Sequence, residues 1–239
     1  MTDFLLLHGA YHAAWHWQPT VTELQRRGHR AIAVDLPIED EDAGATEYAQ
    51  AAAEAARAQL DGPLVAVGHS LAGIVIPLLP QLVEIQELVF LCALLPMPGK
   101  SLVDQFAMQP EMAIHVPPDA VPGPGEPPAS PELAVSIFYA DCPDALAHAA
   151  VGRLRHQAMK PVMEPTPISS WPAVPFRYIL GRDDRVINRA WARTEVPRRL
   201  GEQPIELAGG HSPFLARPVE LADVLLEAPV REEVTSGRS

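Results

Sequence analysis

The sequence predicts an α/β fold: a mainly parallel sheet of about six strands flanked by helices. Short, continuous apolar runs alternate with longer segments of helical pattern, and glycine, proline or aspartate stands at most of the junctions. A run that is apolar throughout is typical of a strand buried on both faces, as in a parallel sheet. The alternation implies right-handed crossover connections that place helices on both faces of the sheet.

The first part of the chain contains four of the expected strands and three of the expected helices. The strands are the apolar runs at residues 4–7, 31–34, 64–67 and 88–91. The helical patterns cover residues 15–27, 46–60 and 71–82. Gly28 follows the first pattern in the usual position after a helix end, and Thr46 is the expected N-cap of the second.

The alternation stops near Pro96 and resumes near Phe176. Strands are then expected at 174–180 and 204–207, and helices at 189–200 and 213–226. The interval contains two helical-looking pieces and a stretch with seven prolines between residues 117 and 131. We therefore predict a core of residues 1–95 and 173–228, a cap inserted at 96–172 over the carboxyl end of the sheet, and a flexible tail at 229–239.

Composition narrows the functional classes. The 239 residues fit one large α/β domain, and 48% hydrophobic with 20% charged residues is ordinary globular usage. A net charge of -12 argues against nucleic acid as a partner. Cys92 and Cys142 form neither a disulfide framework nor a zinc motif. The acidic start and the lack of a ~20-residue apolar stretch predict a soluble, cytoplasmic protein without a membrane partner; a homodimer is left open.

A candidate nucleophile lies where the strand at 64–67 runs into a helical pattern. Residues 67–73 read Val-Gly-His-Ser-Leu-Ala-Gly. The pattern Gly-x-Ser-x-small is typical of a nucleophile elbow, a strained turn that lifts the serine hydroxyl clear of the backbone. Gly68 and Gly73 supply the small residues around Ser70, with Ala72 in the place of the usual last glycine. The alternative is an ordinary turn with an N-cap serine.

Two further segments supply a candidate acid and base. Asp183 and Asp184 follow the strand at 174–180, and His211 lies on a Gly-Gly loop between the last strand and the last helix. A carboxylate there can hold a histidine in the productive tautomer. A charged surface turn and a structural histidine are the alternatives. The order serine, aspartate, histidine, each after a strand, favours a hydrolase.

These residues would act together on a carbonyl group. Serine is a weak nucleophile until a base accepts its proton, and His211 would be that base for Ser70. The oxyanion that develops needs backbone N–H donors. We expect them from Leu71, which follows the nucleophile, and from Ala10 in the loop after the first strand. Gly9 suits that loop because close backbone approach requires the absence of a Cβ.

The chain resembles the α/β-hydrolase superfamily at residues 4–17, 68–73, 181–187 and 210–212. Within it, the chain is similar to the branch of plant methylesterases, hydroxynitrile lyases and related bacterial carboxylesterases. The resemblance implies a hydrolase sheet that lacks the superfamily's first two strands and carries a helical cap. It also implies that the family's Gly-x-x-Asp pattern, counted from Gly181, assigns the acid to Asp184 rather than Asp183.

Two positions separate esterases from cyanohydrin-cleaving lyases in this branch. The lyases carry threonine where this chain has Gly9, and lysine where this chain has Ser212 directly after His211. A cation is needed beside the departing cyanide, and Ser212 cannot supply it. The leading hypothesis is therefore a serine hydrolase that cleaves a small, fairly apolar carboxylic ester through an acyl-enzyme, without a metal or cofactor.

Other readings stay open beside this one. The same triad can serve a lyase, a lactonase or a biosynthetic acyl-transfer enzyme. The hydrolase fold can also persist in a ligand-binding protein without catalytic activity. His12 and His16 have metal-ligand spacing without an acidic third ligand, so we interpret them as supporting or surface residues. The expected substrate pocket comprises Gly9, Tyr11, His12 and Ser212 together with the cap residues Phe106, Met108, Met112, Ile137, Phe138 and Tyr139.

Overall fold

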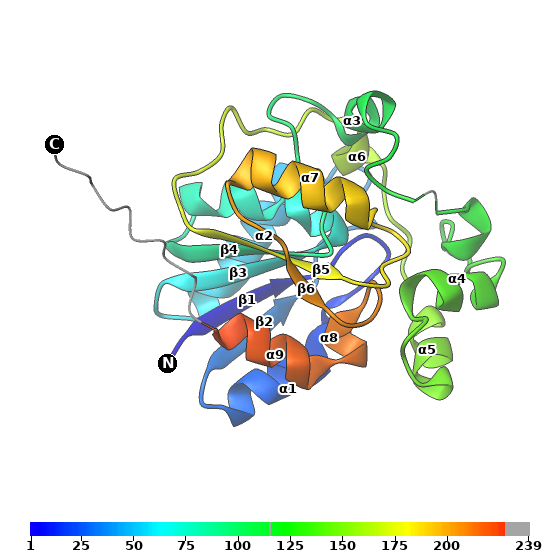
Figure 1. Cartoon of the computed structure of the whole chain (residues 1–239), viewed down its shortest axis with the longest axis horizontal. Helices are drawn as coiled ribbons and strands as arrows, with labels where there is room; N and C mark the ends of the chain where they lie inside the picture. The colour runs from blue at the N-terminus through cyan, green and yellow to red at the C-terminus, as the bar shows by residue number, and fades with distance from the viewer. Residues whose placement is uncertain (115, 228–239) are drawn as a thin grey trace, which may run out of the picture.

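The computed structural model describes residues 1–114 and 116–227. Six strands form one sheet with the order β2-β1-β3-β4-β5-β6, and every neighbouring pair is parallel (Figure 1). They are β1 (Asp3–Leu7), β2 (Arg30–Val34), β3 (Leu64–His69), β4 (Ile85–Leu91), β5 (Phe176–Gly181) and β6 (Ile205–Leu207). The predicted fold class is confirmed. The tail predicted at 229–239 lies outside the described residues.

Helices cover both faces of the sheet, which explains the continuous apolar runs. One face carries α1 (Gln18–Arg26), α8 (Pro213–Ala216) and α9 (Pro218–Leu226); the other carries α2 (Ala45–Gln59) and α7 (Arg189–Leu200) (Figure 1). Every residue of β1 and β3 is buried between these layers. None of the helices in the described part of the chain combines the length and apolar character needed to cross a bilayer.

The prediction of one continuous helix at residues 71–82 is wrong. The segment forms two short 3₁₀ helices instead, η2 (Ser70–Ile74) and η3 (Ile76–Gln81). Pro77 and Pro80 lack the backbone N–H that an α-helix would use there, and the ring of an interior proline clashes with the preceding turn. Residues 71–79 are all buried, whereas Pro80 is half-buried and Gln81 exposed. The apolar pattern therefore predicted the burial of most of this segment but not its helix type.

Prolines also divide two other expected helices. The pattern at 213–226 breaks into α8 and α9 because Pro218 begins a new helix. The pattern at 15–27 begins as a 3₁₀ turn, η1 (Ala14–Trp17), and continues as α1 with Pro19 in its first turn. The expected N-cap Thr46 is also wrong, because Gly44 occupies that position.

The N-terminus of α2 is capped by two carboxylates rather than by a hydroxyl. Glu47 accepts a hydrogen bond from the Gly44 N–H at 2.7 Å, and Glu164 accepts one from the Ala45 N–H at 2.8 Å. Negative charge is favourable at a helix N-terminus because it satisfies otherwise unpaired N–H groups and complements the helix dipole. Glu164 comes from a distant segment, so no local sequence pattern could have identified it.

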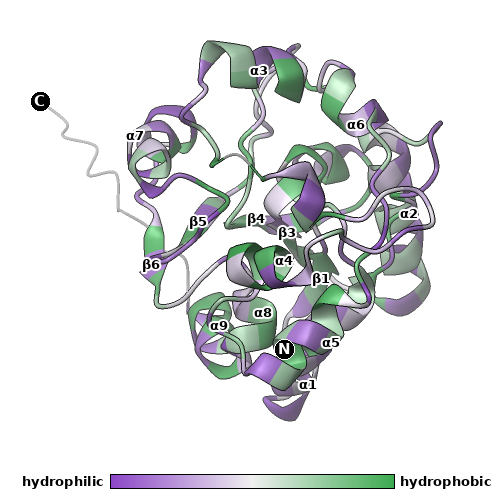
Figure 2. Ribbon diagram, turned by 90° about the vertical axis from the view of Figure 1, so that its right-hand side faces the viewer, coloured by the Kyte–Doolittle hydropathy of each residue, from purple (hydrophilic) through white to green (hydrophobic). Residues whose placement is uncertain are grey.

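Residues 92–175, which we call the β4–β5 segment, contain more helical elements than the two expected. They are α3 (Leu102–Met108), η4 (Pro118–Ala120), α4 (Pro131–Phe138), α5 (Asp144–Val151) and α6 (Lys160–Met163). In Figures 1 and 2, α4 and α5 lie beyond the carboxyl ends of the strands. The segment contacts the core through the Arg155 N–H, which donates to the Tyr11 carbonyl at 2.7 Å.

The sheet has a topological switch point between β1 and β3. The chain passes from β1 to β2 on one side, whereas β3 is followed by β4 on the other. Loops that leave neighbouring strands in opposite directions open a crevice at their carboxyl ends, where ligands bind in open α/β sheets. The fold therefore places the loop after β1 and the turn after β3 on either side of one crevice.

We predict that Arg177→Met destabilises the core. Arg177 forms a buried ion pair with Glu87 at 2.5 Å and donates to the carbonyls of Val224 and Leu225 in α9. Removing Arg177 leaves the buried Glu87 charge without its partner, which lowers the unfolding free energy by about 3–5 kcal/mol. Urea denaturation should show this loss in unfolding free energy. Arg182→Met is the control, because the Arg182 side chain is 57% exposed; equal losses in the two variants would contradict the prediction.

Candidate active site

Ser70 occupies a strained turn between β3 and η2. Its φ angle is 52°, in the left-handed region that side chains with a Cβ rarely adopt. The turn closes because its neighbours are small: a Cβ on Gly68 would lie 2.8 Å from the Ala72 carbonyl oxygen, and one on Gly73 would lie 2.0 Å from that of Leu94. The Leu94 N–H donates to the Ser70 carbonyl at 3.0 Å and holds the turn against the end of β4.

His211 pairs with Asp184 at the ends of the last two strands. The His211 Nδ1 atom lies 3.0 Å from each Asp184 carboxylate oxygen, and both side chains are buried. Asp184 Oδ1 also accepts from the N–H groups of Val186 and Ile187. A carboxylate can only accept, so Nδ1 carries the hydrogen of this bond. Asp183 is exposed, and among the described residues only its backbone N–H forms a hydrogen bond, to the Gly209 carbonyl at 2.9 Å.

The loop that carries His211 is fixed on two sides. A Cβ on Gly181 would lie 2.4 Å from the Gly210 carbonyl oxygen, so only glycine permits this approach of β5 to the loop. On the other side, His69 Nε2 donates to the His211 carbonyl at 2.9 Å. His69 precedes Ser70 directly, and this bond therefore ties the loop to the turn of the serine.

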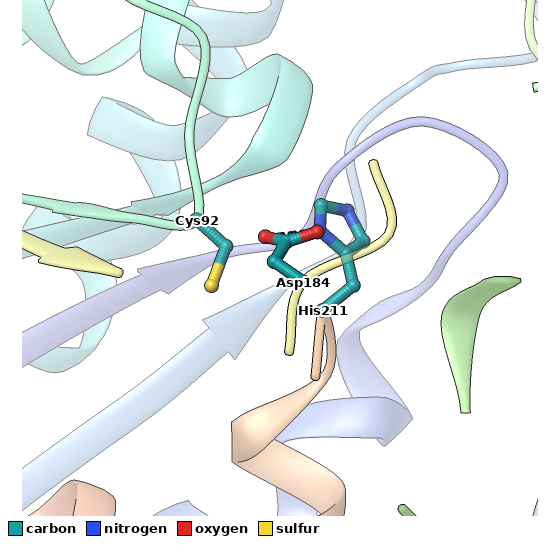
Figure 3. Close-up of side chains that lie close together, drawn as sticks. All are labelled: Cys92, Asp184 and His211. Carbon is teal, nitrogen blue, oxygen red and sulfur yellow. Dashed lines mark hydrogen bonds and ion pairs between the residues drawn. The ribbon is translucent and has the colours of Figure 1, made fainter. Parts of the chain in front are cut away.

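Cys92 lies beside the Asp184–His211 pair (Figure 3). One ligand atom from each of the three residues falls within 4.8 Å of the others, the one such metal-ligand cluster in the described part of the chain. Burial, and then the charge of Asp184, raises the pKa of the Cys92 thiol well above its usual value. A protonated thiol is a poor metal ligand. The His211 Nδ1 atom and the Asp184 carboxylate already form a hydrogen bond with each other. We therefore interpret the three residues as a hydrogen-bonded pair with a neighbouring thiol rather than as a metal centre.

Sequence reasoning assigned no role to Cys92. It follows β4 directly and has a positive φ angle of 45°, and its sulfur accepts from the Gly181 N–H at 3.3 Å. Its place at the carboxyl end of a strand was the signal that could have identified it, because that edge of the sheet is where ligands and reacting groups gather.

The loop of residues 8–12 after β1, which we call the oxyanion loop, passes close to the serine. A Cβ on Gly9 would lie 2.7 Å from the Ser70 Cβ, so the approach requires glycine. Tyr11 has a φ angle of 64°. Ala10 and Leu71, whose N–H groups we expected to face the developing charge, both line the cavity beside Ser70.

One cavity of about 500 Å³ contains Ser70 and His211 in its wall. Among the described residues, no hydrogen bond joins the Ser70 and His211 side chains. Catalytic hydrogen bonds are often long or poorly aligned before substrate binds. The rest of the wall has no charged side chain among the residues that the structure describes. It is mostly apolar: Leu71, Leu94, Leu102, Phe106, Pro110, Ala113, Ile114, Val116, Phe138, Met159, Val162 and Val186.

The structure divides the expected pocket residues into two groups. Tyr11, His12, Phe106 and Phe138 line the cavity. The others lie outside its wall: Gly9, Met108, Met112, Ile137, Tyr139 and Ser212. Met108 is 57% exposed on α3, whereas Met112, Tyr139 and Ser212 are fully buried. Apolar character alone does not show which face of a short helix a side chain occupies, and this explains the Met108 error.

Four buried histidines lie in or behind the cavity wall. They are His8, His12, His16 and His69, and none is more than 1% exposed. Burial lowers the pKa of His8 to about 4 and that of His12 to about 3. It also lowers the pKa values of His16 and His69 well below the usual value. All four are therefore neutral at pH 7, and the surface role considered for His12 and His16 is wrong.

Comparison with known proteins gives similarity over nearly the whole chain. The profile of the alpha/beta hydrolase family matches residues 4–224. Probable esterase PIR7A of Oryza sativa subsp. indica is 27% identical, over 93% of this chain and 95% of that protein. Carbendazim hydrolyzing esterase of Nocardioides sp. (strain SG-4G) is also 27% identical, over 97% and 84%. The solved structure of polyneuridine aldehyde esterase superimposes with a TM-score of 0.77 at 22% identity, covering 95% and 98%.

We predict that the protein loses stability as the pH falls from 6.5 to 5. The four histidines stay neutral in the fold but take up protons when the chain unfolds, so acid favours the unfolded state. Each contributes a slope of up to about 1.4 kcal/mol per pH unit. Carboxylates with lowered pKa, such as Glu23 at about 2, titrate below this window.

Urea denaturation at several pH values measures this slope directly. His16→Gln should lower the number of protons taken up on unfolding, because it removes one of the buried neutral imidazoles. An unfolding free energy that stays constant between pH 7 and pH 5 would show that these histidines are not held neutral by the fold.

Proposed function

Because the chain belongs to the α/β-hydrolase family, we propose that it acts as a carboxylesterase-type enzyme on a small, fairly apolar ester through Ser70, His211 and Asp184. One observation carries the proposal: a histidine oriented by a buried carboxylate shares an apolar cavity with a serine on a strained turn. This is the arrangement that acyl transfer to serine requires. The family assignment also confirms the resemblance drawn from the sequence motifs.

The first half of the reaction forms an acyl-enzyme. Ser70 Oγ attacks the ester carbonyl carbon while His211 Nε2 takes the hydroxyl proton. The C=O π electrons move onto the oxygen, and the N–H groups of Ala10 and Leu71 stabilise that charge. When the intermediate collapses, the bond to the alcohol oxygen breaks and His211 returns the proton to it. The alcohol leaves, and the acyl group remains on Ser70.

Water completes the reaction by the same route. His211 accepts a proton from water as its oxygen attacks the acyl carbon, and the bond to Ser70 Oγ then breaks with return of the proton to the serine. The products are the carboxylic acid and the regenerated enzyme. Throughout, Asp184 stabilises the imidazolium and keeps Nδ1 protonated, so that Nε2 is the nitrogen that faces the reacting groups.

The cavity wall supports an uncharged substrate. Ligand pockets in proteins typically enclose about 300–1,000 Å³, and a cavity of about 500 Å³ suits a small ester. No arginine, lysine, aspartate or glutamate lies among the described lining residues, so a charged substituent would lose its hydration without a partner.

Cyanohydrin cleavage by the same triad has less support. That reaction would need a cation beside the departing cyanide, and no cationic side chain lies among the described lining residues. Ser212, which takes the position of the lyases' lysine, is fully buried. The close packing of Gly9 against Ser70 leaves no room for the lyases' threonine side chain at that position without a shift of the loop.

We predict that Asp184→Asn lowers kcat far more than Asp183→Asn, by a factor on the order of 10⁴. The amide would favour the wrong imidazole tautomer, whereas Asp183 is exposed and its side chain holds nothing in the site. Hydrolysis of p-nitrophenyl butyrate provides the measurement. Comparable losses in the two aspartate variants would refute the assignment.

Ser70→Ala and His211→Ala should each abolish turnover of the same ester, and the double variant should be no worse than either single variant.

We also predict discrimination between two esters of matched length. The kcat/KM for p-nitrophenyl butyrate should exceed that for mono-p-nitrophenyl succinate by a factor on the order of 100, because the terminal carboxylate of the latter finds no cation in the cavity. Mandelonitrile should release no cyanide above the uncatalysed rate. Equal turnover of the two esters would contradict the neutral-substrate assignment, and cyanide release without ester hydrolysis would contradict the reaction class.

A further inference from the structure

Three consecutive carbonyl groups of the oxyanion loop are held by donors behind it. Gly9 O accepts from His8 Nδ1 at 2.8 Å, Ala10 O accepts from His12 Nδ1 at 2.7 Å, and Tyr11 O accepts from the Arg155 N–H at 2.7 Å. A trans peptide is planar, so a carbonyl held in one direction points the next N–H in the other. The two imidazoles therefore fix both peptides that flank the Ala10 Cα.

The two imidazole rings are anchored by different parts of the molecule. His8 is fixed within the core, because its Nε2 accepts from the Leu36 N–H at 3.0 Å while its Nδ1 donates to Gly9. His12 depends on the β4–β5 segment instead, since its Nε2 lies 3.1 Å from the hydroxyl of Tyr139, directly after α4.

The contact with Ala10 assigns the direction of donation along the chain His16–Tyr139–His12. The Ala10 carbonyl can only accept, so His12 carries its hydrogen on Nδ1 and its Nε2 accepts from the Tyr139 hydroxyl. The Tyr139 oxygen then accepts from the His16 Nε2–H at 2.9 Å, which leaves His16 Nδ1, 3.1 Å from both the N–H and the carbonyl oxygen of Ala13, to accept from the N–H. Tyr139 therefore receives one hydrogen bond and donates one.

We propose that Tyr139 is a positioning residue for the oxyanion hole: its hydroxyl anchors the His12 ring, and the His12 Nδ1–H in turn holds the peptide between Ala10 and Tyr11, directly after the peptide whose N–H we assign to the developing charge. The proposal rests on the proposed ester hydrolysis. Tyr139 is fully buried and does not line the cavity, so it acts through His12 rather than on the substrate.

The surroundings of His12 explain why the hydroxyl matters. The aromatic rings of Phe138 and Phe214 lie edge-on to the His12 ring, with centroids at 5.7 Å and 6.0 Å, and offer no hydrogen-bond donor. Without the hydroxyl, the Nε2 lone pair would be buried without a partner and the ring would lose the contact that fixes its orientation, which weakens the hold of the Nδ1–H on the Ala10 carbonyl.

Tyr139→Phe tests the proposal because it removes the hydroxyl and retains the ring. We expect kcat for p-nitrophenyl butyrate to fall roughly tenfold with KM within about twofold, since the loss falls on the transition state. Tyr48→Phe is the matched control. Tyr48 is also a buried tyrosine, its hydroxyl accepts from Gln157 at 3.0 Å, and it does not line the cavity. Its activity should be unchanged.

Two further measurements separate this role from a merely structural one. His12→Asn retains an N–H near the position of Nδ1 but breaks the contact with Tyr139, so adding Tyr139→Phe to it should cause no further loss of kcat. Imidazole ¹⁵N chemical shifts should show His12 protonated on Nδ1 in the parent protein, and the His12 Nε2 resonance should move downfield in Tyr139→Phe because that nitrogen loses its hydrogen-bond donor.

Three results would overturn the proposal: an unchanged kcat in Tyr139→Phe, additive losses in the double variant, or an unchanged His12 Nε2 chemical shift in Tyr139→Phe. If the parent protein hydrolyses no ester, the proposed function fails by itself. The ¹⁵N measurement then still tests whether Tyr139 anchors His12, because it does not depend on turnover.

Discussion

The contact between Gly9 and Ser70 is the constraint on which the rest of the site depends. The two loops leave β1 and β3 in opposite directions from the switch point of the sheet, and they meet again where a Cβ on Gly9 would lie 2.7 Å from that of Ser70. The serine must adopt a positive φ angle to present its hydroxyl there. Small residues at 68 and 73 allow that turn, and the cavity opens beside it.

Holding two loops so close requires donors and acceptors that are satisfied without water. The protein uses neutral imidazoles for this purpose, because each can accept on one nitrogen and donate from the other. His8, His12, His16 and His69 all donate to or accept from backbone groups of the loops around Ser70 and His211. Their burial stabilises the neutral form, so the arrangement that orders the loops also makes the fold sensitive to acid.

Much of the fold and the candidate reacting residues could be predicted from the sequence. Strands buried on both faces leave continuous apolar runs, and the Gly-x-x-Asp pattern of the resembled family, counted from Gly181, indicated Asp184, whose carboxylate lies 3.0 Å from His211 Nδ1. Helix types were less predictable, because Pro77, Pro80 and Pro218 divide segments whose apolar pattern is continuous.

The supporting residues could not be predicted, since their partners lie far away in the sequence. Tyr139 bonds His12 across 127 positions and His16 across 123. No local pattern records such a contact. The same holds for Met108, whose apolar side chain points to solvent because the packing of α3 decides its orientation.

The β4–β5 segment has a consequence for the exchange of parts between relatives. It supplies the Tyr139 hydroxyl and the Arg155 N–H to the oxyanion loop, in addition to forming part of the cavity wall. A chimera that receives this segment from another esterase would therefore acquire a new pocket and a new support for its own loop at once. Recombination that preserves a hydroxyl and a backbone donor at these two places would separate specificity from turnover.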